Sequence, residues 1–380
     1  MLYKKNLILC FLIAIAFFTS CGNSAGGSGV SSESNDGASN SGNQRTPPSS
    51  PYKKIGVVTI GSVTYDIVTF GLWPQTIKQS GVTVDESESS KITVGEFDYY
   101  PGSDGGWYVK KREDGYKSDG NKYSDGSSVM DWEANSYRWF KVEPIKWRVL
   151  TYNYDHDKKE STAGVKLLLA ESVLTTGDVY DGWNTGTRGK DNGKDIVASN
   201  YKYSRIRAYL NGGSYKKQKM NSNDSTTVSF SGKGFLQTAF NNSERLNILE
   251  TTVDNSERST NTDRNPKEWN EGVNDRACEN SKDSVFLLSI QELTKKDYGF
   301  SEDPAVNDTV RIKNAMDYSK SCTVTGLGND STRSWWHRSP ASTGYIYCRG
   351  DVGMNGRVRH DAAGNGGNKE GVVPALCVKN

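Results

Sequence analysis

The sequence has 380 residues, a formal net charge of +2 and a hydrophobic fraction of 34%, which is low for a globular protein. Acidic and basic residues are mixed along the chain, and because no basic block or stripe occurs, the composition does not indicate a nucleic-acid partner. The 39 glycines and 20 tyrosines indicate a domain with much loop structure and a tyrosine-rich surface.

The N-terminus has the pattern of a bacterial export signal. Lys4 and Lys5 precede an apolar segment, residues 7–18, which is too short to span a bilayer. The segment runs into Phe-Thr-Ser-Cys at residues 18–21, which resembles a lipobox with Phe where Leu is commoner. We therefore predict that residues 1–20 are a signal peptide and that Cys21 carries the acyl chains of a lipoprotein, palmitate among them. The alternative is an ordinary signal peptide cut nearby, with Cys21 unmodified.

A segment of simple composition follows the predicted cleavage site. Residues 21–51 are almost entirely Gly, Ser, Asn, Ala and Pro, and without apolar periodicity they cannot bury enough surface to fold. We expect a flexible tether that holds the rest of the chain, residues 52–380, away from the membrane. The expected location is the outer membrane, with the lipid as anchor and the domain facing the cell exterior.

The first half of this domain shows mainly strand and loop patterns. Residues 55–70 alternate apolar and polar side chains, with breaks at glycines, which indicates one or two strands. Residues 102–128 are rich in Asp-Gly and predict a long loop, in which no EF-hand ligand pattern occurs. Residues 139–150 indicate strand, turn and strand, and residues 165–170 predict a short buried strand.

The second half adds short helices. Residues 203–210 predict a helix with Ser204 as N-cap and Gly212 as its end, and Ser243 is expected to cap a second helix that contains Leu246 and Leu249. A polar loop is expected at residues 255–283, an apolar strand at 285–290, and a turn or short helix from 291. Short strands, few helices and long loops favour an α+β domain.

The last fifty residues predict a β-hairpin followed by a buried strand at residues 371–378. Tyr345, Tyr347, Arg349 and Asp351 fall on one face of the first strand, because side chains alternate along a strand. Asn355-Gly356 is a strong hairpin signal, and the returning strand places Arg357, Arg359 and Asp361 on one side. Tyr and Arg are enriched in binding hot spots, so the hairpin is a candidate recognition surface. The alternative is an amphipathic hairpin with one solvated face.

Four cysteines, Cys278, Cys322, Cys348 and Cys377, remain after the signal segment and the lipidation site. Their spacing matches no zinc-ligand pattern. The sequence leaves open whether they are buried free thiols or whether two of them form a disulfide. It predicts no cofactor, and metal binding stays unknown because Asp and Asn are too common here to single out a ligand set.

Five short motifs together resemble the DUF6273 family. Three of them are Phe-Gly-Leu-Trp-Pro-Gln at residues 70–75, Val-Phe-Leu-Leu-Ser at 285–289 and Trp-His-Arg-Ser-Pro at 336–340. Residues 206–211 and 371–376 complete the set, in the order of the family's landmarks. The resemblance implies a C-type-lectin-like fold of the formylglycine-generating-enzyme type within the α+β class.

The chain also resembles the variable proteins of diversity-generating retroelements, in which template adenines, chiefly in Asn codons, are randomised. This resemblance implies a variable region at about residues 335–380 whose solvent-facing positions bind ligand. The varied positions would be His337, Thr343, Tyr345, Tyr347, Arg349, Asp351, Asn355, Arg357, Arg359, His360, Asp361, Asn365 and Asn368. A fixed framework would include Trp335, Trp336, Pro340, Gly356, Pro374 and Leu376. The family usually has Leu where His337 stands, as expected of a varied site, and Arg where Val373 stands, which variation does not explain.

These observations favour a displayed, non-enzymatic protein that binds an unknown protein or glycan ligand, as a monomer attached to the membrane through its lipid. One alternative is an adhesin or structural lipoprotein with a fixed partner, in which residues 337–368 would be invariant. Another is an oxidase of the formylglycine-generating type, which needs two reachable cysteines. Cys348 is predicted on the inward face of the hairpin and Cys377 in a buried strand, and none of His156, His337 and His360 has a recognisable catalytic partner.

Overall fold

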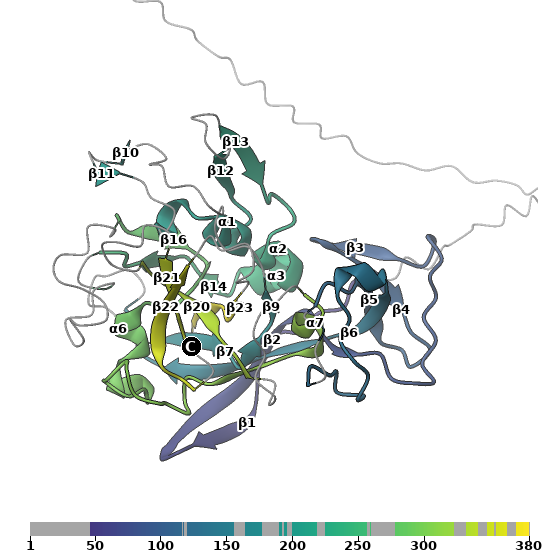
Figure 1. The fold of residues 1–380 in the computed structure, drawn as a ribbon, viewed down its shortest axis with the longest axis horizontal. Helices are drawn as coiled ribbons and strands as arrows, with labels where there is room; N and C mark the ends of the chain where they lie inside the picture. Colours follow the sequence, from purple (N-terminus) through teal and green to yellow (C-terminus); the bar gives the residue numbers. More distant parts are fainter. Residues whose placement is uncertain are drawn as a thin grey trace, which may run out of the picture. The chain divides into compact units, whose positions relative to one another are not determined.

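The fold is that of a computed structural model, in which the chain divides into Met1–Gln44 and Arg45–Asn380, and only the second unit contains described residues. Figure 1 shows the arrangement of its elements. The structure describes residues 46–115, 117, 120–155, 164–176, 190–191, 194–195, 200–218, 225–256, 259, 278–322, 332–340, 348–352, 355–362 and 370–379.

A ten-stranded sheet forms the centre of the unit, and its strands pair in the order β14-β24-β7-β6-β5-β4-β3. β2 pairs with β6 and carries the outer strand β1, while β17 pairs with β24. Its strands are β1 (Lys53–Ile60), β2 (Val63–Ile77), β3 (Ile92–Val94), β4 (Phe97–Pro101), β5 (Trp107–Arg112), β6 (Tyr137–Thr151), β7 (Val165–Ala170), β14 (Ile248–Leu249), β17 (Val285–Phe286) and β24 (Ala375–Lys379).

A five-stranded sheet contains the predicted hairpin and has the strand order β22-β21-β20-β23-β9. Its strands are β9 (Thr175–Thr176), β20 (Trp335–Pro340), β21 (Cys348–Val352), β22 (Val358–Ala362) and β23 (Gly371–Val372). The smaller sheets contain β8 (Ser172–Val173), β18 (Lys313–Ala315) and β19 (Thr332–Arg333), β10 (Lys190–Asp191) and β11 (Lys194–Asp195), β12 (Ser214–Gln218) and β13 (Ser225–Ser229), and β15 (Thr251–Val253) and β16 (Ser281–Asp283).

The helices are short and have well-defined caps. Ser204 accepts a hydrogen bond from the Arg207 amide at the start of α1, and Gly212 ends this helix with a left-handed φ of 67°. None of the described helices is long and apolar enough to cross a membrane. The helices are α1 (Arg205–Asn211), α2 (Phe235–Ala239), α3 (Asn242–Arg245), α6 (Ile290–Leu293), α7 (Asp317–Lys320), η1 (Trp132–Ala134), η2 (Tyr201–Tyr203) and η3 (Lys296–Tyr298).

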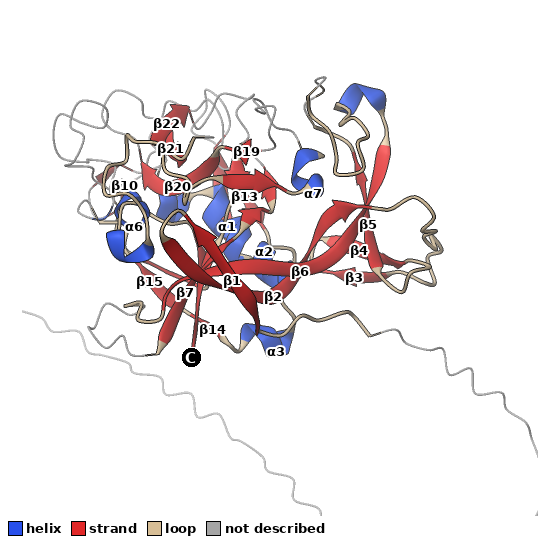
Figure 2. Ribbon diagram, turned by 90° about the horizontal axis from the view of Figure 1, so that it is seen from below, coloured by secondary structure: helices blue, strands red, loops and turns tan. Residues whose placement is uncertain are grey.

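The hydrophobic core extends through both large sheets, and one part of it lies where α2 and α7 pack against β2; Figure 2 shows α2 beside β2. Trp73 contacts the rings of Phe97, Phe235 and Tyr318, with ring centroids 5.0 to 6.2 Å apart. The indole of Trp73 donates a hydrogen bond to the Leu174 carbonyl oxygen. The indole of Trp147, which is also buried, donates one to the Phe70 carbonyl oxygen. The core therefore joins the first strands of the domain to its C-terminal half.

The prediction of an α+β domain is wrong. The structure is 43% strand and 14% helix and contains a curled, half-barrel sheet, so it belongs to the mostly-β class, and the C-type-lectin-like architecture expected within the α+β class is corrected with it. The physical reason is that the described helices are short, since α3, α6 and α7 have four residues each. Segments expected as loops contribute strands instead, including β5 within residues 102–128.

Several local predictions are confirmed. Residues 55–70 lie in two antiparallel strands, β1 and β2, that turn at Gly61, and residues 165–170 form the buried strand β7. Helix α1 has the predicted N-cap and end, and residues 290–293 form the predicted short helix α6.

Other local predictions are corrected. β6 continues through Pro144, where a turn was expected, because Pro144 lies opposite Leu72 next to a register shift in the β2–β6 ladder. Asn241, rather than Ser243, caps α3, and Leu246 beyond this helix is 84% exposed. The apolar run at 285–290 forms only the two-residue strand β17 before Ser289 begins α6.

Candidate functional site

The predicted hairpin is present as strands β21 and β22. Their register pairs Arg349 with Asp361 and Asp351 with Arg359, so these four positions share one face of the ladder. Position 358 belongs to the other face, and Val358 is buried. Position 360 shares the face of Val358, because Gly350 is its partner.

The hairpin turn is fastened through its backbone. The Asn355 carbonyl oxygen accepts a hydrogen bond of 3.2 Å from the Asp308 amide, and the Val358 amide donates one of 2.9 Å to the Pro304 carbonyl oxygen. Between them, Gly356 has a φ of 78°, and a Cβ atom there would lie 1.9 Å from the Asp308 carbonyl oxygen. Only glycine fits this close approach.

A buried arginine, Arg311, also binds the hairpin turn. The guanidinium of Arg311 donates to the carbonyl oxygens of Gly356 at 3.1 Å and Leu293 at 2.9 Å, and also to those of Ser301 and Asp303. Its charge is balanced by Asp308, whose carboxylate lies 3.3 Å away. The segment that contains residues 301–311 is therefore the seat of the hairpin tip.

This seat is connected to the ten-stranded sheet by a second buried arginine. Arg148 on β6 donates to the Val310 carbonyl oxygen at 2.8 Å and makes two hydrogen bonds, of 2.7 and 2.9 Å, to the Glu171 carboxylate. Lys313 lies 3.5 Å from the same carboxylate. Burial lowers the pKa of Lys313 to about 7, and the charge of Arg148 acts in the same direction.

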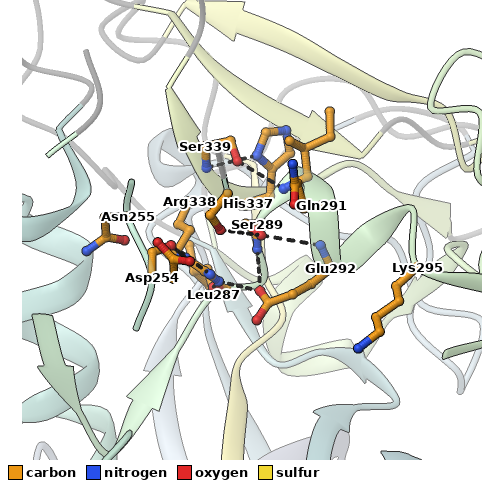
Figure 3. A network of polar contacts seen from close by, with 12 residues as sticks. Asp254, Asn255, Leu287, Ser289, Gln291, Glu292, Lys295, His337, Arg338 and Ser339 are labelled. Atoms are coloured by element: carbon orange, nitrogen blue, oxygen red, sulfur yellow. Dashed lines mark hydrogen bonds and ion pairs between the residues drawn. The ribbon is translucent and has the colours of Figure 1, made fainter. Parts of the chain in front are cut away.

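The root of the hairpin sheet is β20, which is enclosed by protein. Trp335 and Trp336 are buried, and the Trp335 indole donates to the Arg311 carbonyl oxygen at 3.0 Å. Arg338 is also buried and donates to the carbonyl oxygens of Leu287 at 2.6 Å and Asp254 at 3.1 Å (Figure 3). Like Arg311, it satisfies its donors largely on main-chain acceptors.

Glu292 on α6 completes the Arg338 cluster. Its carboxylate pairs with Arg338, accepts a hydrogen bond from the Ser289 amide at 2.7 Å and accepts another from the Tyr154 hydroxyl at 2.6 Å. Burial by itself would raise the pKa of Glu292, but the charge and hydrogen bonds of Arg338 outweigh it and lower that pKa. The Arg338–Glu292 pair is therefore ionised at neutral pH. Its role is structural, because its polar atoms bond main-chain carbonyl oxygens, the Ser289 amide and the Tyr154 hydroxyl.

His337 is fully buried, so its selection as a solvent-facing position is corrected. Its Nδ1 atom accepts a hydrogen bond of 3.2 Å from the Ser339 amide, and the Ser339 hydroxyl accepts one of 2.9 Å from the Ile290 amide (Figure 3). The resemblance that selected position 337 implied a solvent-facing site, but β20 is covered on both sides, with neighbouring Trp336 and Arg338 also buried.

The remaining predicted positions divide by what the structure describes. Asn355 and Arg357 are exposed, and Arg357 donates to the Asn307 side chain at 3.1 Å. The framework residues Trp335, Trp336, Gly356, Pro374 and Leu376 are all buried. Only the backbone is described for Pro340, Arg349, Asp351, Arg359, His360 and Asp361, and Cys21, Thr343, Tyr345, Tyr347, Asn365 and Asn368 lie outside the described residues.

The thiol groups do not form a reachable pair in the described part of the chain. Cys322 is a buried free thiol whose sulfur lies 3.4 Å from the Tyr318 carbonyl oxygen, and Cys377 is buried in β24. Cys278 is half-buried, and the side chain of Cys348 lies outside the description. Within the described ranges, no three His, Cys, Asp or Glu side chains are grouped so that they could hold a metal ion.

Sequence reasoning missed the two residues that seat the hairpin tip, Arg311 and Asp308. Their only sequence signal is the spacing of three, which is common in polar loops. Their acceptors and donors lie far along the chain, since Gly356 is 45 residues away from Arg311.

Comparison with known proteins gives one match. Residues 163–380, more than half of the chain, match the model of the family described as "Domain of unknown function (DUF6273)". No curated protein and no solved structure matches the chain. The matched segment contains the whole hairpin sheet together with its seat and the Arg338 cluster, except for Tyr154.

Proposed function

The chain belongs to the DUF6273 family, and from this premise we propose that it is a lipid-anchored binding protein whose ligand contacts diversified side chains on the β21–β22 hairpin. The finer resemblance behind this proposal is to the treponemal variable protein TvpA, a lipoprotein whose C-terminal segment is rewritten by a diversity-generating retroelement. The proposed anchor is acylated Cys21, and the proposed location is the outer membrane with the domain facing outward.

The observation that carries the proposal is how the hairpin tip is attached. Its buried contacts with the seat use the carbonyl oxygens of Asn355 and Gly356, the amide of Val358 and the absence of a side chain at position 356, while the exposed Arg357 side chain adds one hydrogen bond to Asn307. The side chains of Asn355 and Arg357 are exposed. Because backbone groups are the same for every residue type, the exposed positions are free to change while the tip stays seated.

The composition of the hairpin also supports recognition. The register places two Arg and two Asp positions, 349, 351, 359 and 361, on the face opposite buried Val358. Arginine offers several donors in a planar group, and a neighbouring acid supplies acceptors, so such a face suits a polar or charged partner. The unknown ligand is a protein or a glycan in this proposal.

The decisive experiment is sequencing rather than binding. The codons for residues 335–368 are read from many isolates of one strain, together with the codons for residues 137–170 as a matched control from the core. We expect substitutions concentrated at adenine-containing codons of the hairpin and a constant control segment. We also expect a near-identical adenine-rich template and a reverse-transcriptase gene next to this gene.

A fixed-partner adhesin makes the opposite prediction for the same data. In that case residues 337–368 are identical in all isolates and no template repeat lies nearby. Either finding would remove the diversification from the proposal, whereas variation limited to Arg349, Asp351, Asn355, Arg357 and their neighbours would support it.

A further inference from the structure

A second surface of the domain, far from the hairpin, exposes large aromatic side chains. Trp132 is 59% exposed and Tyr137 is 54% exposed, which is unusual for residues of this size. Both lie near the β4–β5–β6 part of the ten-stranded sheet, outside the segment that matches the family. Figures 1 and 2 both place β3, β4 and β5 away from β20, β21 and β22.

The strand register places three of the aromatic residues on one face, and Trp132 of η1 is linked to this row through its main chain. Tyr137 and Trp139 are two residues apart on β6 and therefore share its outer face, with their Cα atoms about 6.8 Å apart in an extended strand. Tyr100 of β4 lies on the same face, with its ring centroid 5.2 Å from that of Trp139. At the other end, Arg112 pairs with Tyr137 in the ladder and donates to the Trp132 carbonyl oxygen at 2.8 Å. We call Tyr100, Trp139, Tyr137 and Trp132 the aromatic strip.

Opposite faces of these strands have opposite chemistry. Phe97, Tyr99, Val109 and Phe140 point inward and are buried in the core. On the outward face Tyr108 is buried and Tyr100 and Trp139 are half-buried, but Tyr137 is exposed and does not fill the interior, so its exposure needs another explanation. Contiguous exposed aromatic surface commonly marks a binding site.

The two lysines beside the strip have carboxylate partners, and Arg112 adds one further cation. Lys110 lies 5.3 Å from the centroid of the Trp139 ring and forms an ion pair of 2.5 Å with Glu86. Lys141 forms an ion pair of 2.6 Å with Asp104. Because each lysine is paired with a carboxylate, the strip offers both hydrogen-bond donors and acceptors, and its surface charge is mixed rather than of one sign.

This charge pattern decides between kinds of partner. A polyanion would meet Glu86 and Asp104 as well as the lysines, so its attraction would be weak. The core of a protein interface is depleted of charged residues, whereas here charged side chains lie beside the rings. A sugar fits both features, since its C–H bonds lie against the negative face of an aromatic ring and its hydroxyls bond donors and acceptors alike.

We propose that the aromatic strip is a second, fixed binding surface that takes a neutral glycan. It does not depend on the hairpin, so the protein would combine a constant glycan contact with a separate recognition surface. Trp132 and Tyr137 would stack on sugar rings, while Lys110, Glu86 and Arg112 would bond the hydroxyl groups.

The test is calorimetric titration of the full chain with cellohexaose, chitohexaose and mannohexaose, and with heparin as the anionic comparison. We expect at least one neutral hexasaccharide to bind. Trp132→Ala and Tyr137→Ala should each weaken that binding about tenfold, which corresponds to about 1.4 kcal/mol for the lost aromatic stacking contact. Trp132→Phe should retain most of the affinity.

Two control variants separate this surface from others. Leu246→Ala removes an apolar side chain elsewhere that is even more exposed, and Arg357→Ser alters the hairpin; both variants should bind the hexasaccharide as the parent does. The proposal is overturned if none of the three neutral glycans binds, if heparin alone binds, or if the Trp132 and Tyr137 variants bind normally. Loss of glycan binding in Arg357→Ser would also overturn it, because the ligand would then occupy the hairpin.

Discussion

The ten-stranded sheet and the C-terminal hairpin sheet share one hydrophobic core, which includes Trp335, Trp336 and Val358, but the hairpin sheet has additional polar attachments at its root and tip. The large sheet packs through apolar and aromatic side chains such as Trp73, Phe140 and Trp147. Arg338 attaches the root of the hairpin sheet, and Arg311 attaches its tip. Both guanidinium groups donate their hydrogen bonds largely to main-chain carbonyl oxygens.

This difference has a consequence for sequence change. Apolar packing depends on the shape of every side chain in the contact, so a core substitution is felt even when it changes volume slightly. A hydrogen bond to a main-chain carbonyl is indifferent to the side chain that the same residue carries. The hairpin tip thus has an attachment that survives variation on its outer positions, whereas the packed core positions of both sheets tolerate little change.

The largest effect should follow from breaking the root. Arg338→Met leaves Glu292 buried without its cation, and we expect a loss of about 3–5 kcal/mol in the free energy of unfolding, measured by urea denaturation. The double variant Arg338→Met with Glu292→Gln should lose less, because no uncompensated charge remains. Equal losses in the single and double variants would show that the ion pair is not what holds the root.

The tip should be next in sensitivity. Gly356→Ala places a methyl group against the Asp308 carbonyl oxygen at a left-handed φ, and we expect a loss of about 2 kcal/mol or more. Gly61→Ala is the matched control, because Gly61 also has a positive φ but an added Cβ there meets no atom within 4 Å. If both variants lose the same free energy of unfolding, the contact between position 356 and the Asp308 carbonyl oxygen costs nothing beyond the backbone strain of a positive φ.

The pH dependence of stability tests the link between the large sheet and the seat. The lowered pKa of Lys313, about 7, lies below its value of about 10.4 in an unfolded chain. Between these values the unfolded state binds a proton that the native state lacks, so stability rises with pH by up to about 1.4 kcal/mol per unit. Below pH 7 Lys313 is protonated in both states, and its contribution to the slope disappears.

Comparison with Lys313→Met isolates this contribution. Urea denaturation of both proteins at pH 7, 8 and 9 should show the parent gaining stability relative to the variant as the pH rises. Raised tyrosine pKa values, such as that of Tyr65 at about 12, act only near and above pH 10 and do not interfere. Parallel curves for the two proteins would mean that Lys313 keeps its proton in the native state.

Local chemistry explains which parts of this architecture are predictable from the sequence. Ser204 and Gly212 predict the two ends of α1, and Asn355-Gly356 predicts the hairpin, because in each case the signal and the structure lie within a few residues. The mostly-β class was not predicted, because two-residue strands such as β14 and β17 exist only through pairing with β24.

The attachment of the candidate site was not predictable for a related reason. Arg311 and Arg338 have no distinctive local pattern, and their acceptors are carbonyl oxygens up to 84 residues away. The burial of His337 likewise depends on β20 being covered by distant segments rather than on its own alternation. Strand periodicity predicts which positions share a face but not whether that face meets solvent.

The claim that the hairpin is seated independently of its outer side chains has one direct test. It is the free energy of unfolding, from urea denaturation, of a variant with Ser at positions 349, 351, 355, 357, 359 and 361, measured beside Arg311→Met. We expect the sixfold variant to lie within roughly 1 kcal/mol of the parent, since surface substitutions have small effects, and Arg311→Met to lose about 3 kcal/mol. A sixfold variant as unstable as Arg311→Met would contradict the account.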